Sequence, residues 1–357
     1  MRVSDRRFPY DDLPPAQVWT EAFERKGATD PQGAVRFALS RDTSIGSAGS
    51  CFAVRLAERL RAYGMNYYTA EPGPARLSPE LQFAYGYRPL SARYGNVYTF
   101  LQLEQLLARA CGTFVPALPA WRAADGTFVD PFRPHVQPTG FDSIAELEAD
   151  REAHLRAVRE MFAAIDTFIF TAGLIAVWCD KETGAALPRP PGRKLGEFEA
   201  GRYELRELDV AQNVAAFESF MTTLLALNPN ARVILSVSPV HQIATTNHPH
   251  IGRASTYAKA TLRVAAETIV RNSPRVDYFA SYELVTLPRA GPSAYLPDLR
   301  SISSDALEDV MRSFFTNYFA LDIDELQPIA PSQDPLDVRP CDEVEVMLSI
   351  AMEGSGG

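Results

Sequence analysis

Two short apolar runs, separated by a long helical segment, constrain the fold of this chain more than any other feature. Residues 166–172 are DTFIFTA and residues 232–238 are RVILSVS. Such runs are typical of strands buried on both faces, because a strand with one face in water alternates apolar and polar residues. Between them, residues 210–227 place apolar side chains at helical spacing. Buried strands alternating with amphipathic helices predict an α/β protein, a three-layer α/β/α sandwich around a mainly parallel sheet.

The same alternation extends along the chain and predicts one large α/β domain over residues 43–320. We expect further strands at 43–48, 65–69 and 275–280, and further helices at 52–63, 99–111, 142–165, 254–271 and 304–319. Segments rich in proline, glycine and aromatic residues are expected to be insertions, at 70–98, 112–140 and 179–208. The remaining segments are expected to be an N-terminal wrap over 1–42 and a C-terminal extension with a flexible tail over 321–357.

Composition narrows the classes of partner. The net charge of −9 disfavours binding to nucleic acids and anionic membranes, which requires clustered lysine and arginine. No stretch approaches the roughly 20 apolar residues that cross a bilayer, and the charged N-terminus lacks the apolar segment of a signal peptide. The four cysteines are far apart, which is typical of a reduced protein without a disulfide framework or structural zinc. We expect a cytoplasmic protein that takes a small-molecule or carbohydrate substrate, without cofactor or metal; the oligomeric state stays open.

The turn after the first expected strand is the candidate site, since ligands of parallel sheets bind beyond the carboxyl ends of the strands. Gly49 and Ser50 occupy this turn. A serine there lies at a helix N-terminus, where backbone N–H groups and the helix dipole favour a developing negative charge. Two interpretations stay open: Ser50 is a nucleophile, or its side chain only caps the helix. Cys51 is a competing nucleophile that we expect to pack into the core.

The run Gly-Ser-Cys-Phe-Ala at 49–53 resembles the signature of the GSCFA family, which is related to SGNH-type esterases and acyltransferases. Further blocks that resemble this family follow in its order: YGNVYT at 94–99, DPFRP at 130–134, FTAGL at 170–174, SVSPV at 236–240 and YFASYE at 278–283. The resemblance covers roughly residues 42–318. It implies a flavodoxin-like, SGNH-hydrolase-like sandwich.

The resemblance also implies roles for residues at the strand ends. Ser50 is then the nucleophile. Its backbone N–H forms an oxyanion hole together with further donors, which are Gly95 or Asn96, and Gly173. No cofactor enters this chemistry.

The residues at the acid and base positions depart from the pattern of SGNH enzymes. SGNH enzymes carry them as Asp-x-x-His near the C-terminus, and the corresponding stretch here runs from Asp298 to Ser301. Asp298 fills the aspartate position, but Ser301 stands in place of the histidine, and a serine is no base near neutral pH. His241, which follows the strand at 232–238, is our preferred base, because that strand end can face Ser50.

The remaining histidines are weaker candidates. His154 lies on a helix beside charged residues and is expected to face solvent. His248 and His250 can contact one metal ion, but no cysteine or carboxylate cluster supports such a site. We therefore expect no metal.

Several other residues each leave two interpretations open. Trp178 is an apolar or sugar-stacking wall, or it is core packing. Near it, Ala176 stands where many relatives carry glutamate. Lys259 and Arg263 hold an anionic group of the substrate, or they form a solvated basic face. Glu283 orients a base, or it pairs locally.

Two functions follow from these expectations. The first is a serine esterase or O-acyltransferase that acts on an acylated sugar or small metabolite. The second is a degenerate relative that has lost its base and binds a ligand in glycan or metabolite assembly.

Overall fold

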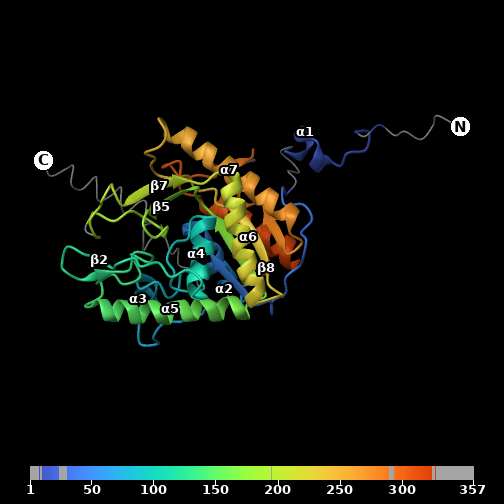
Figure 1. The fold of residues 1–357 in the computed structure, drawn as a ribbon. Coiled ribbons are helices and arrows are strands. Elements are labelled where there is room, and N and C mark those ends of the chain that lie inside the picture. The colour runs from blue at the N-terminus through green and yellow to red at the C-terminus, as the bar shows by residue number, and fades with distance from the viewer. Residues whose placement is uncertain are drawn as a thin grey trace.

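The computed structural model describes residues 8, 10–23, 30–193, 195–288, 293–323 and 326. Its centre is a four-stranded sheet in the order β1-β4-β8-β9, formed by Ile45–Ala48, Thr167–Ala172, Arg232–Val237 and Val276–Phe279 (Figure 1). Every pairing in it is parallel. The prediction of a mainly parallel sheet is thus confirmed. Most of the expected C-terminal extension lies outside the described residues.

The strand expected at residues 65–69 is reduced to one parallel bridge, in which Tyr67 pairs with Ile45 of β1. The Ile45 N–H donates to the Asn66 carbonyl at 2.9 Å, and the Tyr68 N–H donates to the Ile45 carbonyl at 2.8 Å. With this segment at its edge, the sheet follows the flavodoxin-like strand order, in which the second strand lies outside the first. The direction of winding then reverses between β1 and β4, and such a switch point opens a crevice for ligands.

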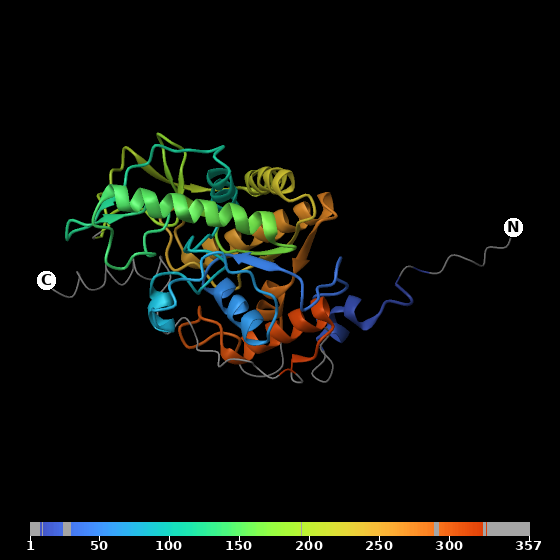
Figure 2. The same cartoon turned by 90° about the horizontal axis from the view of Figure 1, so that it is seen from below.

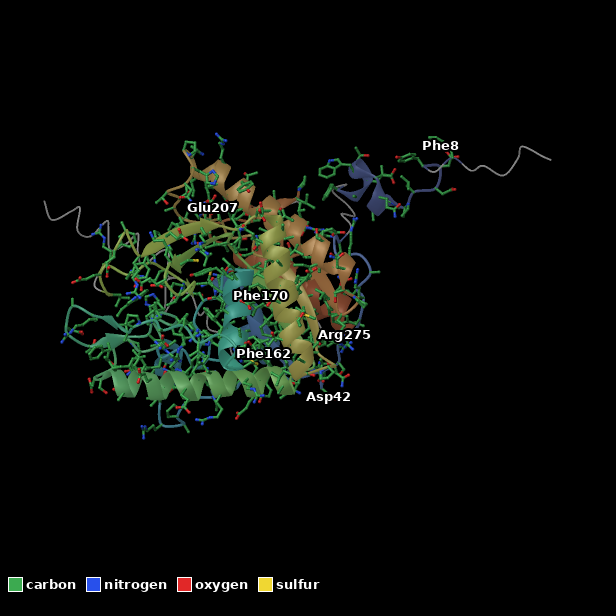
Figure 3. All side chains as sticks on the ribbon, viewed as in Figure 1. Phe8, Asp42, Phe162, Phe170, Glu207 and Arg275 are labelled. Atoms are coloured by element: carbon green, nitrogen blue, oxygen red, sulfur yellow. The ribbon has the colours of Figure 1, made fainter. Side chains whose placement is uncertain are left out.

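Helices cover both faces of the sheet (Figure 2). One face carries α4 (Phe100–Ala110), α5 (Ile144–Ala164), α6 (Val210–Leu227) and α7 (Ile251–Asn272). The other carries α2 (Cys51–Ala62), α8 (Ser281–Thr286), α9 (Ser304–Phe314) and the π-helical turn Phe315–Phe319. Phe168 and Phe170 of β4 pack into the first layer and Ile169 into the second. Phe170 and Phe162 of α5 are fully buried there (Figure 3).

The long helices begin where the sequence places capping residues. Thr99 and Asp209 each form a capping box, with Gln102 and Gln212 respectively, and Ser143 caps α5. Contrary to the expectation that no stretch approaches the length of a membrane span, one described helix, α6, is long and apolar enough to cross a membrane by length and composition alone. It lies within the first layer instead, packed against α4 and α7.

Two of the expected insertions form a second, antiparallel layer. It consists of the β2-β3 hairpin (Trp121–Arg122 with Phe128–Val129) and a sheet in the order β6-β5-β7 (Ala186–Leu187, Ala176–Asp180, Tyr203–Glu207). Trp121 and Phe132 from the 112–140 insertion pack against Leu187 and Tyr203 from the other. Since β5 begins four residues after β4 ends, this layer lies next to the carboxyl end of the parallel sheet. Shorter helical segments are η1 (Pro15–Gln17), α1 (Trp19–Ala22) and α3 (Pro79–Ala84).

Buried ion pairs attach the 112–140 insertion to α5. The fully buried Asp130 carboxylate accepts hydrogen bonds from Arg133 and Arg151, each at 2.8 Å. The equally buried Arg133 also binds Asp150 at 2.8 Å, and Asp150 binds Arg93 at the same distance. Burial raises the pKa of Asp130, but the charge of Arg133 and then that of Arg151 outweigh it and hold this pKa well below its usual range. The DPFRP block therefore has a structural role.

Replacing Asp130→Asn is expected to lower the free energy of unfolding by about 3–5 kcal/mol, because it removes a fully buried anion from between Arg133 and Arg151. Urea denaturation followed by circular dichroism measures this loss. The control is Arg271→Gln, which removes an exposed partner of Glu267 and should cost less than about 1 kcal/mol. Equal losses in the two variants would contradict the role given to Asp130.

Candidate functional site

The chain passes from β1 to α2 through a turn that only glycine fits. Gly49 has a φ of +153°, and a Cβ atom there would lie 2.6 Å from the Ala53 Cβ and 3.0 Å from the Thr171 carbonyl oxygen. Real Cβ atoms do not approach other atoms so closely. This tight contact fixes the N-terminus of α2 beside the carboxyl end of β4, at the switch point of the sheet.

Ser50 is the residue that precedes α2, yet its side chain makes no capping hydrogen bond. This excludes the interpretation that Ser50 serves only as a helix cap. The residue is 4% exposed. Its hydroxyl points toward the turn after β4, because a Cβ atom placed on Gly173 would lie 3.6 Å from the Ser50 Oγ. We expected the adjacent Cys51 to pack into the core. It is only half-buried.

The Gly173 N–H is not available as an oxyanion donor in this structure. It donates to the Tyr98 carbonyl at 2.9 Å, and the Leu174 N–H donates to the same oxygen at 3.2 Å. The expectation that Gly173 stabilises an oxyanion through this N–H is therefore corrected. Gly173 instead holds the segment before α4 in place.

That segment lies against the turn that carries Ser50. The Val97 N–H donates to the Gly49 carbonyl at 2.9 Å. Gly95 and Asn96 precede this contact, Gly95 exposed with a φ of +68° and Asn96 half-buried. The segment that carries these two expected donors thus runs past the turn of Ser50.

A buried lysine reaches the same turn from α7. Lys259 is 1% exposed, and its Nζ donates to the Gly173 carbonyl at 2.7 Å. It is therefore no part of a solvated basic face. Arg263, one turn further along, binds Glu283 at 2.6 Å, so that Glu283 pairs locally and orients no histidine.

His241 has its ring fixed on two sides. Its Nδ1 lies 2.7 Å from the Ser255 Oγ, and its ring stacks on Tyr295 with 5.4 Å between the centroids. Burial, then the charge of Lys259 and then that of Arg300, lower the pKa of His241 below its ordinary value. The imidazole is accordingly neutral at pH 7. If Nδ1 carries the proton and donates it to Ser255, Nε2 remains a proton acceptor.

The structure does not bring the Asp298 carboxylate to the His241 imidazole. Asp298 is exposed, and its carboxylate accepts hydrogen bonds from the Ser301 hydroxyl at 2.6 Å and from the N–H groups of Arg300 and Ser301. These bonds close a turn within its own loop. The loop reaches His241 through Arg300, whose Nε donates to the His241 carbonyl at 2.8 Å.

Other histidines have structural partners. His154 is buried and lies 2.7 Å from Glu71, so the expectation that it faces solvent is wrong. Burial is the main cause that lowers the pKa of His154 to about 4. His250 caps α7 by accepting the Gly252 N–H, and His248 lies 3.0 Å from Glu207. Across the described ranges, no three side chains of metal-ligating type come together.

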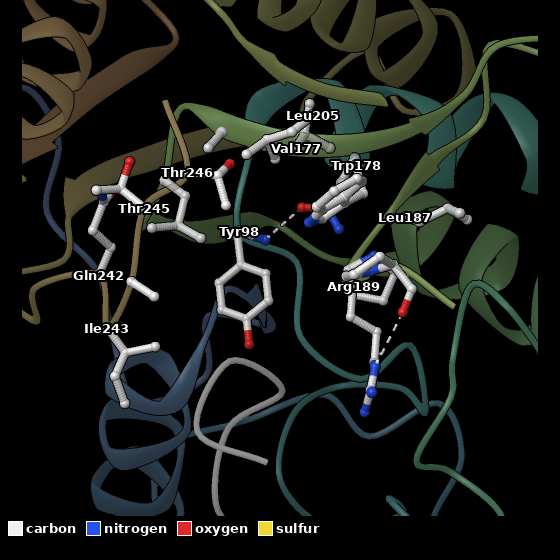
Figure 4. Close-up of a pocket in the computed structure, with 16 residues that line it drawn as sticks. Tyr98, Val177, Trp178, Leu187, Arg189, Leu205, Gln242, Ile243, Thr245 and Thr246 are labelled. Carbon is white, nitrogen blue, oxygen red and sulfur yellow. Dashed lines mark hydrogen bonds between the residues drawn. The ribbon is translucent and has the colours of Figure 1, made fainter. Parts of the chain in front are cut away.

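The lining of a cavity of about 240 Å³ includes Leu174, which follows Gly173, and Tyr98, whose carbonyl accepts the Gly173 N–H. The Tyr98 ring stands in it between the loop of Gln242 and Ile243 and the wall formed by Trp178 and Arg189 (Figure 4). Trp178 is half-buried and packs edge-on against Phe198 at 5.6 Å, so it is both a pocket wall and part of the antiparallel layer. The sequence did not identify Tyr98 or this loop as pocket residues, because both depend on how the insertions pack.

The sequence pattern of the GSCFA family matches residues 44–314. The chain belongs to the GSCFA family. Among solved structures, this GSCFA protein is similar to "An Acetyl Xylan Esterase (Est2A) from the Rumen Bacterium Butyrivibrio proteoclasticus", with 13% identity and a TM-score of 0.29, over 77% of this chain and 64% of that one. This chain thus spans less than two thirds of that esterase, and so distant a likeness carries no argument about activity. No protein of curated function matches.

In this GSCFA protein, Gly49→Ala is expected to lower the free energy of unfolding by about 1–3 kcal/mol, because the new methyl group overlaps Ala53 and the Thr171 carbonyl. Thermal melting measures the effect. Gly201→Ala is the matched control, since a Cβ atom at Gly201 meets nothing within 4 Å. A melting temperature that is unchanged for Gly49→Ala would show that the turn tolerates a side chain.

Proposed function

We propose that this protein is a serine esterase or O-acyltransferase whose nucleophile is Ser50. The observation that supports this most directly is the orientation of the Ser50 side chain, which leaves its own helix uncapped and faces Gly173. In a serine that caps its helix, the hydroxyl oxygen accepts a hydrogen bond from a backbone N–H group. The Ser50 oxygen accepts no such bond, so we propose that it acts on a ligand at the switch point of the sheet.

The proposed reaction has two stages. The Ser50 Oγ forms a bond to the acyl carbon of an ester while its proton passes to the base, and the alcohol then leaves with that proton. The resulting acyl-enzyme is cleaved by water in an esterase, or by an acceptor hydroxyl in an acyltransferase. The Ser50 N–H, with Gly95 or Asn96, binds the oxyanion, supported by the positive N-terminus of α2.

His241 is the proposed base, and Ser255 the residue that orients it. The 2.7 Å contact of Ser255 with Nδ1 fixes the ring in the way that a carboxylate does in the usual triad. The substrate class remains an acylated sugar or small metabolite, with Trp178 as an apolar wall beside the reacting bond.

One observation favours the second function, a GSCFA protein that binds its ligand without turnover. The Asp298 carboxylate is occupied by Ser301, and the partner of His241 is a neutral hydroxyl. A base without a carboxylate partner is a weaker proton acceptor. Covalent labelling separates the two functions.

A fluorophosphonate probe is expected to label Ser50, because it needs the same nucleophile and oxyanion site as an ester. Intact-mass and peptide mapping locate the label. Ser50→Ala should abolish it and lower ester hydrolysis by roughly 10³-fold or more. Cys51→Ala, at the neighbouring position, should keep both. An unlabelled, folded wild-type protein at saturating probe would favour the binding function.

On the acid side of its pH profile, kcat/KM is expected to decrease with a midpoint below pH 6.5. The base must be neutral to accept a proton, and the pKa of His241 is lowered from its ordinary value. Lys259→Met removes a neighbouring positive charge, so this midpoint should move to higher pH. Lys259→Arg keeps the charge and should leave the midpoint near its original position.

Histidine proton resonances give a reading that is independent of catalysis. In Lys259→Met, the His241 resonance should titrate at a higher pH than in the wild type. If that resonance moves while the midpoint of the kcat/KM profile stays, His241 is not the base.

A further inference from the structure

The cavity lined by Tyr98 and Leu174 has a surface made mainly of carbon. Its walls include the rings of Tyr98 and Trp178 and the side chains of Leu174, Ala176, Val177 and Ile243. A sugar ring enclosed by such walls would lose the hydrogen bonds of its hydroxyl groups, at a cost of a few kcal/mol for each group. The walls therefore match an apolar group.

Two polar side chains of the lining bind the protein itself. The Gln102 Oε1 accepts the N–H groups of Tyr98 and Thr99 at 3.0 and 3.1 Å. Arg189, the charged residue among the described lining residues, is 5% exposed and donates to the carbonyls of Pro190 and Gly192. These two groups keep the loops in place, and the amide of Gln242 and the hydroxyls of Thr245 and Thr246 add a small polar part to a mainly apolar lining.

Position links this cavity to the proposed nucleophile. A point one Cβ bond above Gly173 lies 3.6 Å from the Ser50 Oγ and 3.7 Å from Cδ1 of the Tyr98 ring. The hydroxyl and the ring that lines the cavity thus both lie within 4 Å of the same point. A carbonyl attacked by Ser50 would have one of its substituents directed along Tyr98 into the cavity.

The volume sets the size of that substituent. A cavity of about 150 Å³ holds benzene, and this one is about 240 Å³. It accommodates a phenyl ring with a short chain, or a medium-length alkyl chain. An acetyl group would leave most of it unfilled.

We propose that this cavity is the acyl pocket, and that the preferred substrates are esters of aromatic or medium-chain acids rather than acetate esters. The inference rests on the function proposed for Ser50 and specifies its substrate class. The alcohol part of the ester then lies outside the cavity.

The first test uses ethyl esters of straight-chain acids from acetate to decanoate, with acid release followed by titration so that no aromatic leaving group enters the cavity. For each added methylene, kcat/KM is expected to rise about three- to fourfold until the pocket is full. Ala176→Phe fills the pocket and should lower the octanoate-to-acetate ratio of kcat/KM at least tenfold. Ala145→Phe, on the exposed face of α5, should leave this ratio unchanged.

The second test measures binding without turnover. Titration calorimetry of the Ser50→Ala protein is expected to give saturable binding of octanamide, no binding of acetamide, and no octanamide binding once Ala176→Phe is added. A labelled Ser50 together with no octanamide binding and no rise in kcat/KM with chain length would overturn the acyl pocket and leave the esterase proposal standing. Octanamide binding without any labelling or ester hydrolysis would overturn the esterase proposal and, with it, the assignment of the cavity to an acyl group.

Discussion

The contact between Gly49 and its neighbours determines the geometry of the site. Without a side chain there, α2 begins directly at the carboxyl end of β1, against Ala53 and the Thr171 carbonyl of β4. This brings Ser50 level with Gly173, where the sheet reverses its direction of winding. The hydrogen bonds from Val97 to Gly49 and from Gly173 to Tyr98 then hold a third segment across the same point. Close packing at one glycine therefore brings three distant parts of the chain together.

Buried ion pairs around Asp130 hold an insertion against the main sandwich. The Asp130 ion pairs join the 112–140 insertion to α5, and Trp121 and Phe132 join the same insertion to β6 and β7. The wall that contains Trp178 is thus anchored to the main sandwich. Desolvating these ions is costly and is compensated only while each charge keeps its partners. Such a network holds the 112–140 insertion against α5.

The strongly patterned parts of the fold could be predicted from the sequence. The runs at 166–172 and 232–238 form β4 and β8, and the helix expected at 210–227 is α6 with the same bounds. The strand β5 was not predicted, because its five residues straddle the start of the insertion expected at 179–208. At the site, the sequence places Ser50 and Gly173 at strand ends. It does not show that Lys259 is buried, since its contact with the Gly173 carbonyl joins two distant elements. It also does not show that Asp298 binds Ser301 within its own loop, since the sequence does not fix the conformation of that loop.

The electrostatics of the site constrain how it can work. Lys259 and Arg300 oppose the charging of His241, and no carboxylate among the described residues is hydrogen-bonded to this imidazole. A base of low pKa is a weak acceptor for the serine proton, but its conjugate acid is a strong donor to a leaving alkoxide. In the proposed reaction, the difficult stage is then the attack of Ser50, during which negative charge would develop on the substrate oxygen. The N-terminus of α2 and the buried cation of Lys259 would both favour that charge. In that proposal, the positive charge that weakens the base also stabilises the intermediate that the base helps to form.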